Sequence, residues 1–430
     1  MSGQTAILWE GETLVSTLVT SELVNEWPEY SLGELGKVIT GNTPSKDNPG
    51  DWGEAMPFIT PSDYKNYRKK AAQSIRSLSD EGVRRLAKRV LPANSVLVTC
   101  IGSDMGKVVM NATEAVTNQQ INALVPNNDV VDANFLYYSL VSLHETLVTH
   151  GSDGTAVPIL NKGDFEKLTV QIPPLAGQRA IASVLSSLDE KIDLLHRQNA
   201  TLEALAETLF RQWFVEATNN LKPGKFGDWV EGTIGGEWGK EVSEGEFIQP
   251  AYCIRGTDIA DLQIGLAYKT PLRFVKPKKF ESIQPKTGDI IIEISGGTEN
   301  QSTGRALYIN DDIKSFYSQP LIFSNFCRMI RPINEQYSFF IYLYIQYLYK
   351  QDEFFGLENG SSGIKNLDYK ALLFEIEYLM PTEDRVLEFD KQVSPYYSKI
   401  NQNKRQVQTL EKLRDTLLPK LMSGDVRVAY

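Results

Sequence analysis

The residues of this 430-residue chain that could do chemistry lie first in its Gly-rich loops. Gly102 and Lys107 border a loop that suggests a phosphate site, but three residues separate its two glycines where a P-loop has four. Gly239-Lys240 is followed by Glu241, where a P-loop has the Ser or Thr that binds magnesium. These loops therefore do not predict nucleotide hydrolysis.

Acidic and metal-binding side chains also lack the spacing that catalysis needs. Asp289 and Glu293 suggest a nuclease, but Ser295 stands where the lysine should follow, and the run 289–294 is typical of a buried strand. No Asp/Asn-Pro-Pro-aromatic stretch for adenine methylation occurs. The few histidines and cysteines are scattered, which predicts buried free thiols in a reducing cytoplasm and no metal site. They are His144, His150, His196, Cys100, Cys253 and Cys327.

Two runs of basic residues suggest contact with phosphates, although the net charge is −10. Residues 65–89 hold nine basic and two acidic side chains, and residues 269–286 hold six and one. A solvated surface is the ordinary explanation of a charge run. Because the two runs occupy similar places in two halves of the chain, nucleic-acid binding is the alternative that we consider.

Two long helices must organise these segments. Between Ile181 and Trp213, apolar residues recur at alternating steps of three and four, without Pro or Gly. This heptad pattern predicts a helix about 50 Å long, which needs a partner of similar length. The same spacing recurs from Phe389 to Leu421, where Pro395 is expected to kink the helix or mark its start.

The chain is also duplicated, because the first helix superposes on the second after a shift of 208 positions. Thr201-Leu202-Glu203 matches Thr409-Leu410-Glu411, and such agreement exceeds what heptads alone would produce. Between the helices, residues 254–258 match 59–63, and Asn366 matches Asn161. We expect strands at 95–101, 121–125 and 168–172 and helices at 79–89 and 135–147, with a short helix or strand near 14–24. The predicted fold is mixed α/β, with the order domain, long helix, domain, long helix.

The duplication also predicts how the helices pair. Two related halves that meet across a pseudo-two-fold axis can place these helices antiparallel. The axis would set Asn199 against Asn403 in one polar layer, with Leu195 against Val407 beside it. The predicted interhelix residues are Leu195, Asn199, Leu202, Leu209, Asn403, Val407, Leu410 and Leu417.

Three motifs resemble those of the specificity subunits of type I restriction-modification enzymes. Pro173-Pro174-Leu175-Ala176-Gly177-Gln178 is similar to the start of that family's central helix, although Gly177 replaces a usual Glu. Residues 417–424 resemble its C-terminal ending, and Gly41 to Ser45 with Ile59 to Asp63 resemble the opening of its target recognition domains. The second domain lacks the Thr-Pro-Ser loop, and its helix start at 381–385 has lost most of the motif.

The resemblance implies two target recognition domains, at 1–175 and 217–381, and two spacer helices, at 176–216 and 382–430. Each domain would read one half of a bipartite, asymmetric site in double-stranded DNA. The helix pair would set the spacing and bind two modification subunits. Partner subunits would carry S-adenosylmethionine, ATP and magnesium, including restriction subunits that translocate and cleave. The chain itself would be non-catalytic, without cofactor or metal, cytoplasmic and not in a membrane.

Loop and helix side chains of such domains would contact base edges and phosphates. Each could instead cap its own loop backbone. The candidates in the first domain are Asn42, Thr43, Ser45, Lys46, Lys65, Arg84, Arg85, Lys88, Ser103, Lys107, Asn118 and Gln119. Those in the second are Arg255, Lys278, Lys279, Thr298, Asn300, Gln301 and Arg305.

Two other classes of protein remain as alternatives. A coiled-coil scaffold whose domains bind protein would need no matched basic surfaces. A self-contained nuclease or methyltransferase would need the motifs that are missing.

Overall fold

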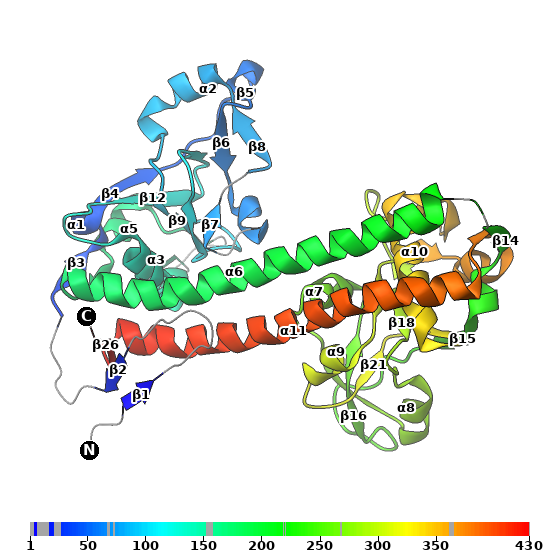
Figure 1. The fold of residues 1–430 in the computed structure, drawn as a ribbon. Helices are drawn as coiled ribbons and strands as arrows, with labels where there is room; N and C mark the ends of the chain where they lie inside the picture. Colours follow the sequence, from blue (N-terminus) through cyan, green and yellow to red (C-terminus); the bar gives the residue numbers. More distant parts are fainter. Residues whose placement is uncertain are drawn as a thin grey trace. The chain divides into compact units, whose positions relative to one another are not determined.

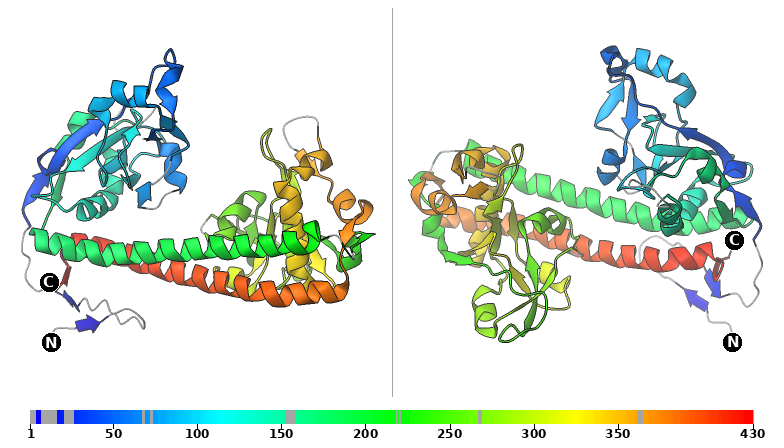
Figure 2. Two further views of the ribbon diagram at one scale, coloured as in Figure 1. Left: turned by 45° about the horizontal axis from the view of Figure 1, so that its top comes forward. Right: turned by 180° about the vertical axis from the view of Figure 1, so that it is seen from behind.

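The computed structural model describes 27–66, 69–71, 74–151, 158–217, 219, 221–266, 269–360 and 365–429, with backbone only at 65 and 66, and two short strands before residue 27. The chain forms two compact units (Figures 1 and 2). Unit 1 comprises residues 1–194 and 409–430, and unit 2 comprises residues 195–408. Each unit therefore contains one α/β domain and a part of each long helix.

The two long helices are α6, Leu175–Arg211, and α11, Glu383–Met422. Gln178 fixes the start of α6: its buried side-chain amide donates to the carbonyls of Pro173 and Val130 and accepts from the N–H of Asp132. This bonding gives the Pro-Pro-Leu-x-x-Gln motif a structural reason.

The helix α11 runs through Pro395 without ending. The expectation that Pro395 could mark the start of the helix is therefore wrong. Proline removes one helical hydrogen bond, but the fully buried Val393 and Ile400 pack on either side of it. Tertiary packing thus outweighs the local preference.

In unit 2 the two helices run antiparallel. Asn403 Nδ2 donates to Asn199 Oδ1 at 2.9 Å, and Arg385 Nη2 donates to the carbonyl of Trp213 at 2.7 Å. Residue numbers thus rise along one helix as they fall along the other. The predicted pairing of Asn199 with Asn403 is confirmed, and both side chains are buried. The other predicted interhelix residues are buried, except Leu202 and Leu209, which are half-buried.

Replacing Asn403 alone by Leu should destabilise the helix pair by about 1–3 kcal/mol, because the Asn199 amide stays buried without its donor. Replacing both asparagines by Leu should return the stability close to the wild-type value, since no buried polar group is then left unpaired. Hydrogen exchange of the α11 amides near residue 403 measures both effects. Equal destabilisation in the single and double variants would contradict this account.

The α/β domain of unit 1 is built on a five-stranded sheet in the order β4 (Gly36–Thr40), β12 (Ile121–Pro126), β9 (Val96–Thr99), β10 (Val108–Asn111) and β7 (Lys70–Ala71). The four residues of β9 are all buried, as its continuous apolar sequence predicts. A second sheet has the order β11 (Val116–Thr117), β6 (Met56–Ile59), β8 (Arg76–Leu78) and β5 (Trp52–Gly53).

Unit 2 repeats this plan. Its four-stranded sheet has the order β15 (Val230–Gly235), β22 (Cys327–Pro332), β18 (Ile290–Glu293) and β20 (Ala306–Tyr308). A second sheet has the order β17 (Leu272–Val275), β16 (Gln249–Ile254) and β21 (Leu321–Phe323). Aromatic side chains of α10 (Ser338–Lys350) pack on Phe210 and Phe214.

The shorter elements complete the fold. The expected helix at 135–147 is two helices that Leu143 separates, α3 (Ala133–Ser142) and α4 (His144–Gly151). The helix expected at 79–89 is α2 (Asp80–Arg85) followed by a 3-10 turn. The segment expected near 14–24 contains the strand β2 (Thr17–Thr20), which pairs with β26 (Val426–Val428). The remaining helices are α1 (Leu32–Leu35), α5 (Lys162–Lys167), α7 (Ile259–Gln263), α8 (Pro277–Ile283) and α9 (Asp311–Ser315). The remaining strands are β1 (Gln4–Ala6), β2 (Thr17–Thr20), β3 (Glu29–Ser31), β13 (Thr169–Gln171), β14 (Lys222–Gly224), β19 (Ser295–Gly296), β23 (Glu358–Asn359), β24 (Lys365–Leu367), β25 (Tyr378–Met380) and β26 (Val426–Val428).

Hydrogen bonds identify equivalent positions in the two units. The N–H of Asn118 donates to the carbonyl of Ile59, and the N–H of Ser324 donates to the carbonyl of Ile254. Residue 59 therefore matches residue 254, as predicted. The predicted match of Asn161 with Asn366 is wrong. Asn161 accepts from an N–H three residues later, and Asp368 does the same, which makes Asp368 its equivalent.

Candidate nucleic-acid interface

The first candidate surface is the loop of unit 1 that follows β4. Asn42, Ser45 and Lys46 are exposed there, and Thr43 Oγ1 donates to Gln119 Oε1 at 2.6 Å. Gln119 is also exposed, so two loops that lie 76 positions apart in the chain come together. The structure thus places five predicted residues on one polar surface.

Asn118 has a different position from its neighbour. Its side chain is 8% exposed, donates to Gln120 Oε1 at 2.8 Å and accepts from the N–H of Gln120. These bonds hold the turn before β12. The exposed amide of this turn is therefore that of Gln119, and Asn118 has the alternative role of a loop cap.

Ser103 and Lys107 lie in the loop between β9 and β10. Both are exposed, and Lys107 Nζ is 2.5 Å from Asp104 Oδ1. Gly102 and Gly106 have φ of +91° and +82°, which favour glycine. The two glycines thus shape a tight turn between strands, which fits the sequence evidence against a phosphate-binding loop.

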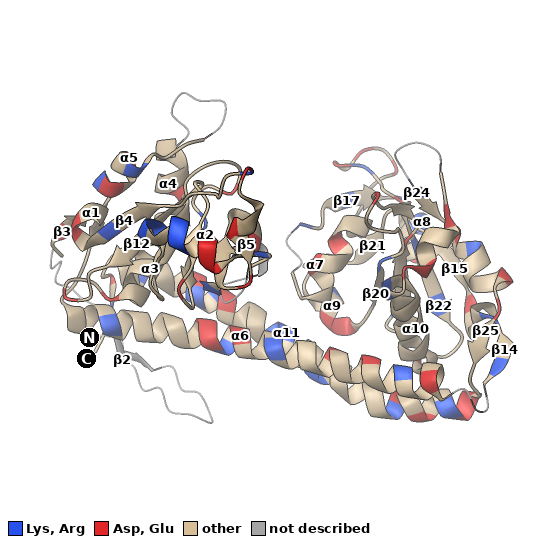
Figure 3. Ribbon diagram, turned by 90° about the horizontal axis from the view of Figure 1, so that it is seen from above, with Lys and Arg blue, Asp and Glu red and all other residues tan. Residues whose placement is uncertain are grey.

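The basic run of unit 1 is divided between the surface and the interior. Arg84, Arg85 and Lys88 are exposed on α2 and the turn after it. Figure 3 shows basic and acidic positions close together on α2. Arg85 pairs with Glu81 and Asp51, whereas Arg84 and Lys88 form no ion pair with any described residue. Lys65 is described only in its backbone, so its side chain lies outside the described part. Of the predicted phosphate contacts on this run, Arg84 and Lys88 therefore keep a positive charge that no described acid pairs with.

Lys69 belongs to the same basic run in sequence, but its side chain is buried. Its Nζ lies 2.6 Å from Ser186 Oγ and 3.3 Å from the Tyr138 hydroxyl. Burial lowers the pKa of Lys69 to about 8. Lys69 therefore joins the domain to the helix α6 within unit 1 and does not contribute to the basic surface.

The basic run of unit 2 is largely neutralised by acids from other segments. Lys269 pairs with Asp261, Arg273 with Glu241 and Lys276 with Glu246. Of the predicted phosphate contacts, Lys278 is exposed without an ion pair to a described residue, and Lys279 Nζ lies 3.5 Å from the carbonyl of Gly235. The two units thus do not have matching basic surfaces. The charge count over residues 269–286 did not detect this, because the three acids lie outside that range.

The Gly-rich loop of unit 2 carries the remaining candidates. Thr298, Asn300 and Gln301 are exposed, and the N–H of Thr298 donates to the carbonyl of Gln301 at 2.8 Å. Arg305 ends this loop, where its guanidinium group is bound to the carboxylate of Glu293. The acid that suggested a nuclease in the sequence is thus an ion-pair partner.

Arg255 is held in a repeated frame. The carboxylate of Asp258 accepts the N–H of Arg255 at 2.9 Å, as Asp63 accepts the N–H of Thr60 at 2.7 Å in unit 1. Arg255 also donates through Nε and Nη2 to Asp258, and through Nη2 to the carbonyl of Lys269. The backbone frame is therefore the same in both units, while the side chain at its first position changes from Thr to Arg.

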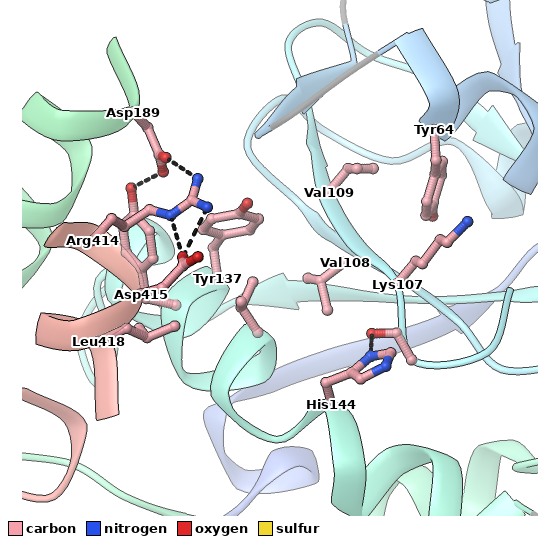
Figure 4. A pocket seen from close by; sticks show the side chains of 13 residues that line it. Tyr64, Lys107, Val108, Val109, Tyr137, His144, Asp189, Arg414, Asp415 and Leu418 are labelled. Carbon is pink, nitrogen blue, oxygen red and sulfur yellow. Dashed lines mark hydrogen bonds and ion pairs between the residues drawn. The ribbon is translucent and has the colours of Figure 1, made fainter. Parts of the chain in front are cut away.

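A buried ion pair in unit 1 was not foreseen from the sequence. Arg414 Nη1 of α11 lies 2.9 Å from Asp189 Oδ1 of α6 (Figure 4). Tyr138 of α3 donates to Asp189 Oδ2 at 2.5 Å. Asp189 is 5% exposed in its side chain. The group lines a cavity of about 390 Å³ that His144 and Lys107 also border. Asp189 and Arg414 lie within the two heptad segments, 225 positions apart, so the sequence gives no indication that they pair.

The described residues contain no cluster of three or more His, Cys, Asp or Glu side chains that could hold a metal ion. The three cysteines are buried, as predicted, and burial raises the pKa of each thiol to about 12. Within the described ranges, no helix combines the length and apolar character needed to cross a membrane.

Comparisons with known proteins show which family this chain resembles. Residues 25–204 match the family model of the type I restriction modification DNA specificity domain. The chain is 25% identical to the type I restriction enzyme MjaIX specificity subunit of Methanocaldococcus jannaschii, with 98% of each chain covered. It is 37% identical to the HindI specificity subunit of Haemophilus influenzae over 34% of this chain and 32% of that one.

A solved structure, that of the type I restriction-modification S subunit from M. genitalium, has the same fold. Its TM-score is 0.56 at 18% identity, covering 93% of this chain and 97% of that chain. Residues 25–204 thus match a type I restriction modification DNA specificity domain, and the chain is similar to a specificity subunit of a type I restriction enzyme along nearly its whole length.

Proposed function

We propose that each α/β domain reads one half of a bipartite, asymmetric site in double-stranded DNA, and that the helices α6 and α11 set the spacing between the halves. The observation that carries this proposal is the frame that both units share. Asp63 and Asp258 cap the same turn, while the residues held by these turns are Thr60 and Arg255. A constant backbone with different polar side chains is what two readers of different sequences need.

We also propose the partners. Two modification subunits would bind the helix pair and supply S-adenosylmethionine and methyl transfer. Restriction subunits would supply ATP- and magnesium-dependent translocation and cleavage. The protein-binding scaffold is less favoured, because residues 25–204 match a DNA specificity domain and the relative that covers 98% of this chain is a specificity subunit.

Mapping methylated adenines in DNA exposed to this chain with its modification subunit tests the proposal. We expect methylation at one bipartite sequence with two different halves and a fixed spacer. Methylation at a continuous site, or at a palindrome, would contradict separate reading by two domains.

The salt dependence of binding tests the surface of α2. Replacing Arg84 and Lys88 by Ala should lower the slope of log affinity against log salt by about 1.8, because each neutralised phosphate contributes about 0.9. Filter binding or fluorescence anisotropy from low to moderate salt measures the slope.

Lys162 and Lys167 supply the matched control. Both are exposed on α5 and paired with acids, so their replacement by Ala changes the net charge equally. The control variant should keep the wild-type slope. If both variants had the same slope, Arg84 and Lys88 would not contact phosphates.

A further inference from the structure

Two structurally equivalent positions differ in chemistry between the units. In unit 1 the N–H of Thr99 donates to the carbonyl of Lys107 at 2.9 Å, and in unit 2 the N–H of Glu293 donates to the carbonyl of Arg305 at 2.9 Å. Each pair closes the loop between the two strands of one hairpin. Thr99 and Lys107 of unit 1 are therefore replaced by Glu293 and Arg305 in unit 2.

The side chains of Arg305 and Glu293 form a bidentate ion pair. Nε donates to Oε2 at 2.9 Å, and Nη2 donates to Oε1 at 2.7 Å. Glu293 is 3% exposed in its side chain and Arg305 is 20% exposed. These bonds occupy one edge of the guanidinium group. No described residue accepts from Nη1 or from the second hydrogen of Nη2, so the opposite edge keeps two parallel donors.

Two glycines leave room for the carboxylate of Glu293 beside Arg305. A Cβ on Gly256 would lie 2.3 Å from Glu293 Oε1, and one on Gly296 would lie 2.6 Å from the same atom. Gly296 also has φ of +155°, a conformation that side chains disfavour. Only backbone therefore approaches Glu293 at these two positions, and a side chain at either one would collide with its carboxylate.

We propose that Arg305 reads a guanine in the half-site of unit 2, donating from Nη1 and Nη2 to O6 and N7 in the major groove. An arginine whose free edge offers two parallel donors matches guanine among the four bases. Glu293 is a positioning residue, because it fixes the guanidinium plane and thus removes rotamer freedom before DNA binds. This inference rests on the proposed reading of one half-site by each domain.

Two other arginines of unit 2 that pair with a buried carboxylate differ from Arg305, one in its bonding and one in its position. Arg255 uses both Nη2 hydrogens, for Asp258 and for the carbonyl of Lys269, so two parallel donors are not left. Arg331 pairs with Asp289 by Nε at 2.9 Å and Nη2 at 2.6 Å, with side-chain exposures of 19% and 3%. That pair has the geometry of Arg305–Glu293 at the opposite end of β18, so it is a matched control.

The test measures binding of the complex of this chain with its modification subunit to its methylation-mapped site. The half-site of unit 2 is the one that changes when residues 217–381 are exchanged for another domain. Each guanine of that half-site is replaced in turn by 7-deazaguanine. The analogue lacks the N7 acceptor. At one guanine it should weaken wild-type binding about tenfold, and Arg305→Gln should reduce discrimination between G·C and A·T there by about 10- to 100-fold.

The effects of Arg305→Gln and of 7-deazaguanine on the binding affinity should not be additive. The 7-deazaguanine effect should vanish in Arg305→Gln and persist in Arg331→Gln, and the other half-site should be unaffected in both. Glu293→Gln should give partial discrimination, and Arg305→Lys should lose it, because Lys cannot donate along two parallel directions. Thermal unfolding of each complex confirms that the variants fold.

Two results would overturn the inference. One is a half-site of unit 2 without an invariant G·C pair, and the other is a 7-deazaguanine effect that persists in Arg305→Gln. Either result leaves the proposed function intact if the wild-type complex still methylates a bipartite site. Absence of any bipartite site would instead refute the proposed function.

Discussion

Replacing Asp189 by Leu is expected to destabilise unit 1 by about 3 kcal/mol, because the partly buried guanidinium group of Arg414 then keeps only the exposed carboxylate of Asp415 as a partner. The loss also removes the acceptor of the Tyr138 hydroxyl, which lies 2.5 Å from Asp189 Oδ2. Hydrogen exchange of the most protected amides of α3 and β9 measures the change, since these amides report opening of unit 1.

Replacing both Asp189 and Arg414 by Leu should recover most of the lost stability, because no uncompensated charge remains. An exposed pair supplies the control: Asp164 and Lys167 are 55% and 78% exposed in their side chains. Replacing Asp164 by Ala should change the stability by no more than about 1 kcal/mol. If the double variant were as unstable as Asp189→Leu alone, the Asp189–Arg414 ion pair would not determine the stability of unit 1.

Exchanging residues 217–381 for the matching domain of another specificity subunit should change one half of the methylated sequence and leave the other half unchanged. Affinity for the original site should fall by about 10³-fold or more, the usual difference between specific and non-specific binding. Methylation mapping together with competition binding measures both results.

The reciprocal exchange of residues 27–174 is the control for this experiment. It should alter the other half-site and retain the first. A change of both halves in either exchange would contradict independent reading. A change of spacer length alone would assign the exchanged residues to spacing and not to base recognition.

Local periodicity determined much of this protein. The heptads of α6 and α11 specify two long helices, and the match at a shift of 208 positions specifies two related domains. The antiparallel register is predicted from a pseudo-two-fold axis placed near position 197, which sets Asn199 opposite Asn403, and the hydrogen bond between these side chains in unit 2 agrees with this pairing. A buried β-strand such as β9 is equally visible, since its apolar residues are consecutive and β-branched.

Only the tertiary structure decided which charges are available. Lys276 reads as part of a basic run, yet Glu246 pairs with it from 30 positions away. Lys69 reads as exposed and is buried against Ser186. A count along the chain cannot detect such partners, because electrostatic pairing depends on distance in space.

The same reason explains Glu293 and Pro395. The sequence pattern made Glu293 a possible catalytic acid, but the β18–β20 hairpin brings Arg305 to its carboxylate from 12 positions away. Pro395 has a local preference to end a helix, but packing of Val393 and Ile400 outweighs it. The sequence thus determines elements whose signal is repeated along the chain, whereas single side chains obtain their role from contacts that only the folded chain creates.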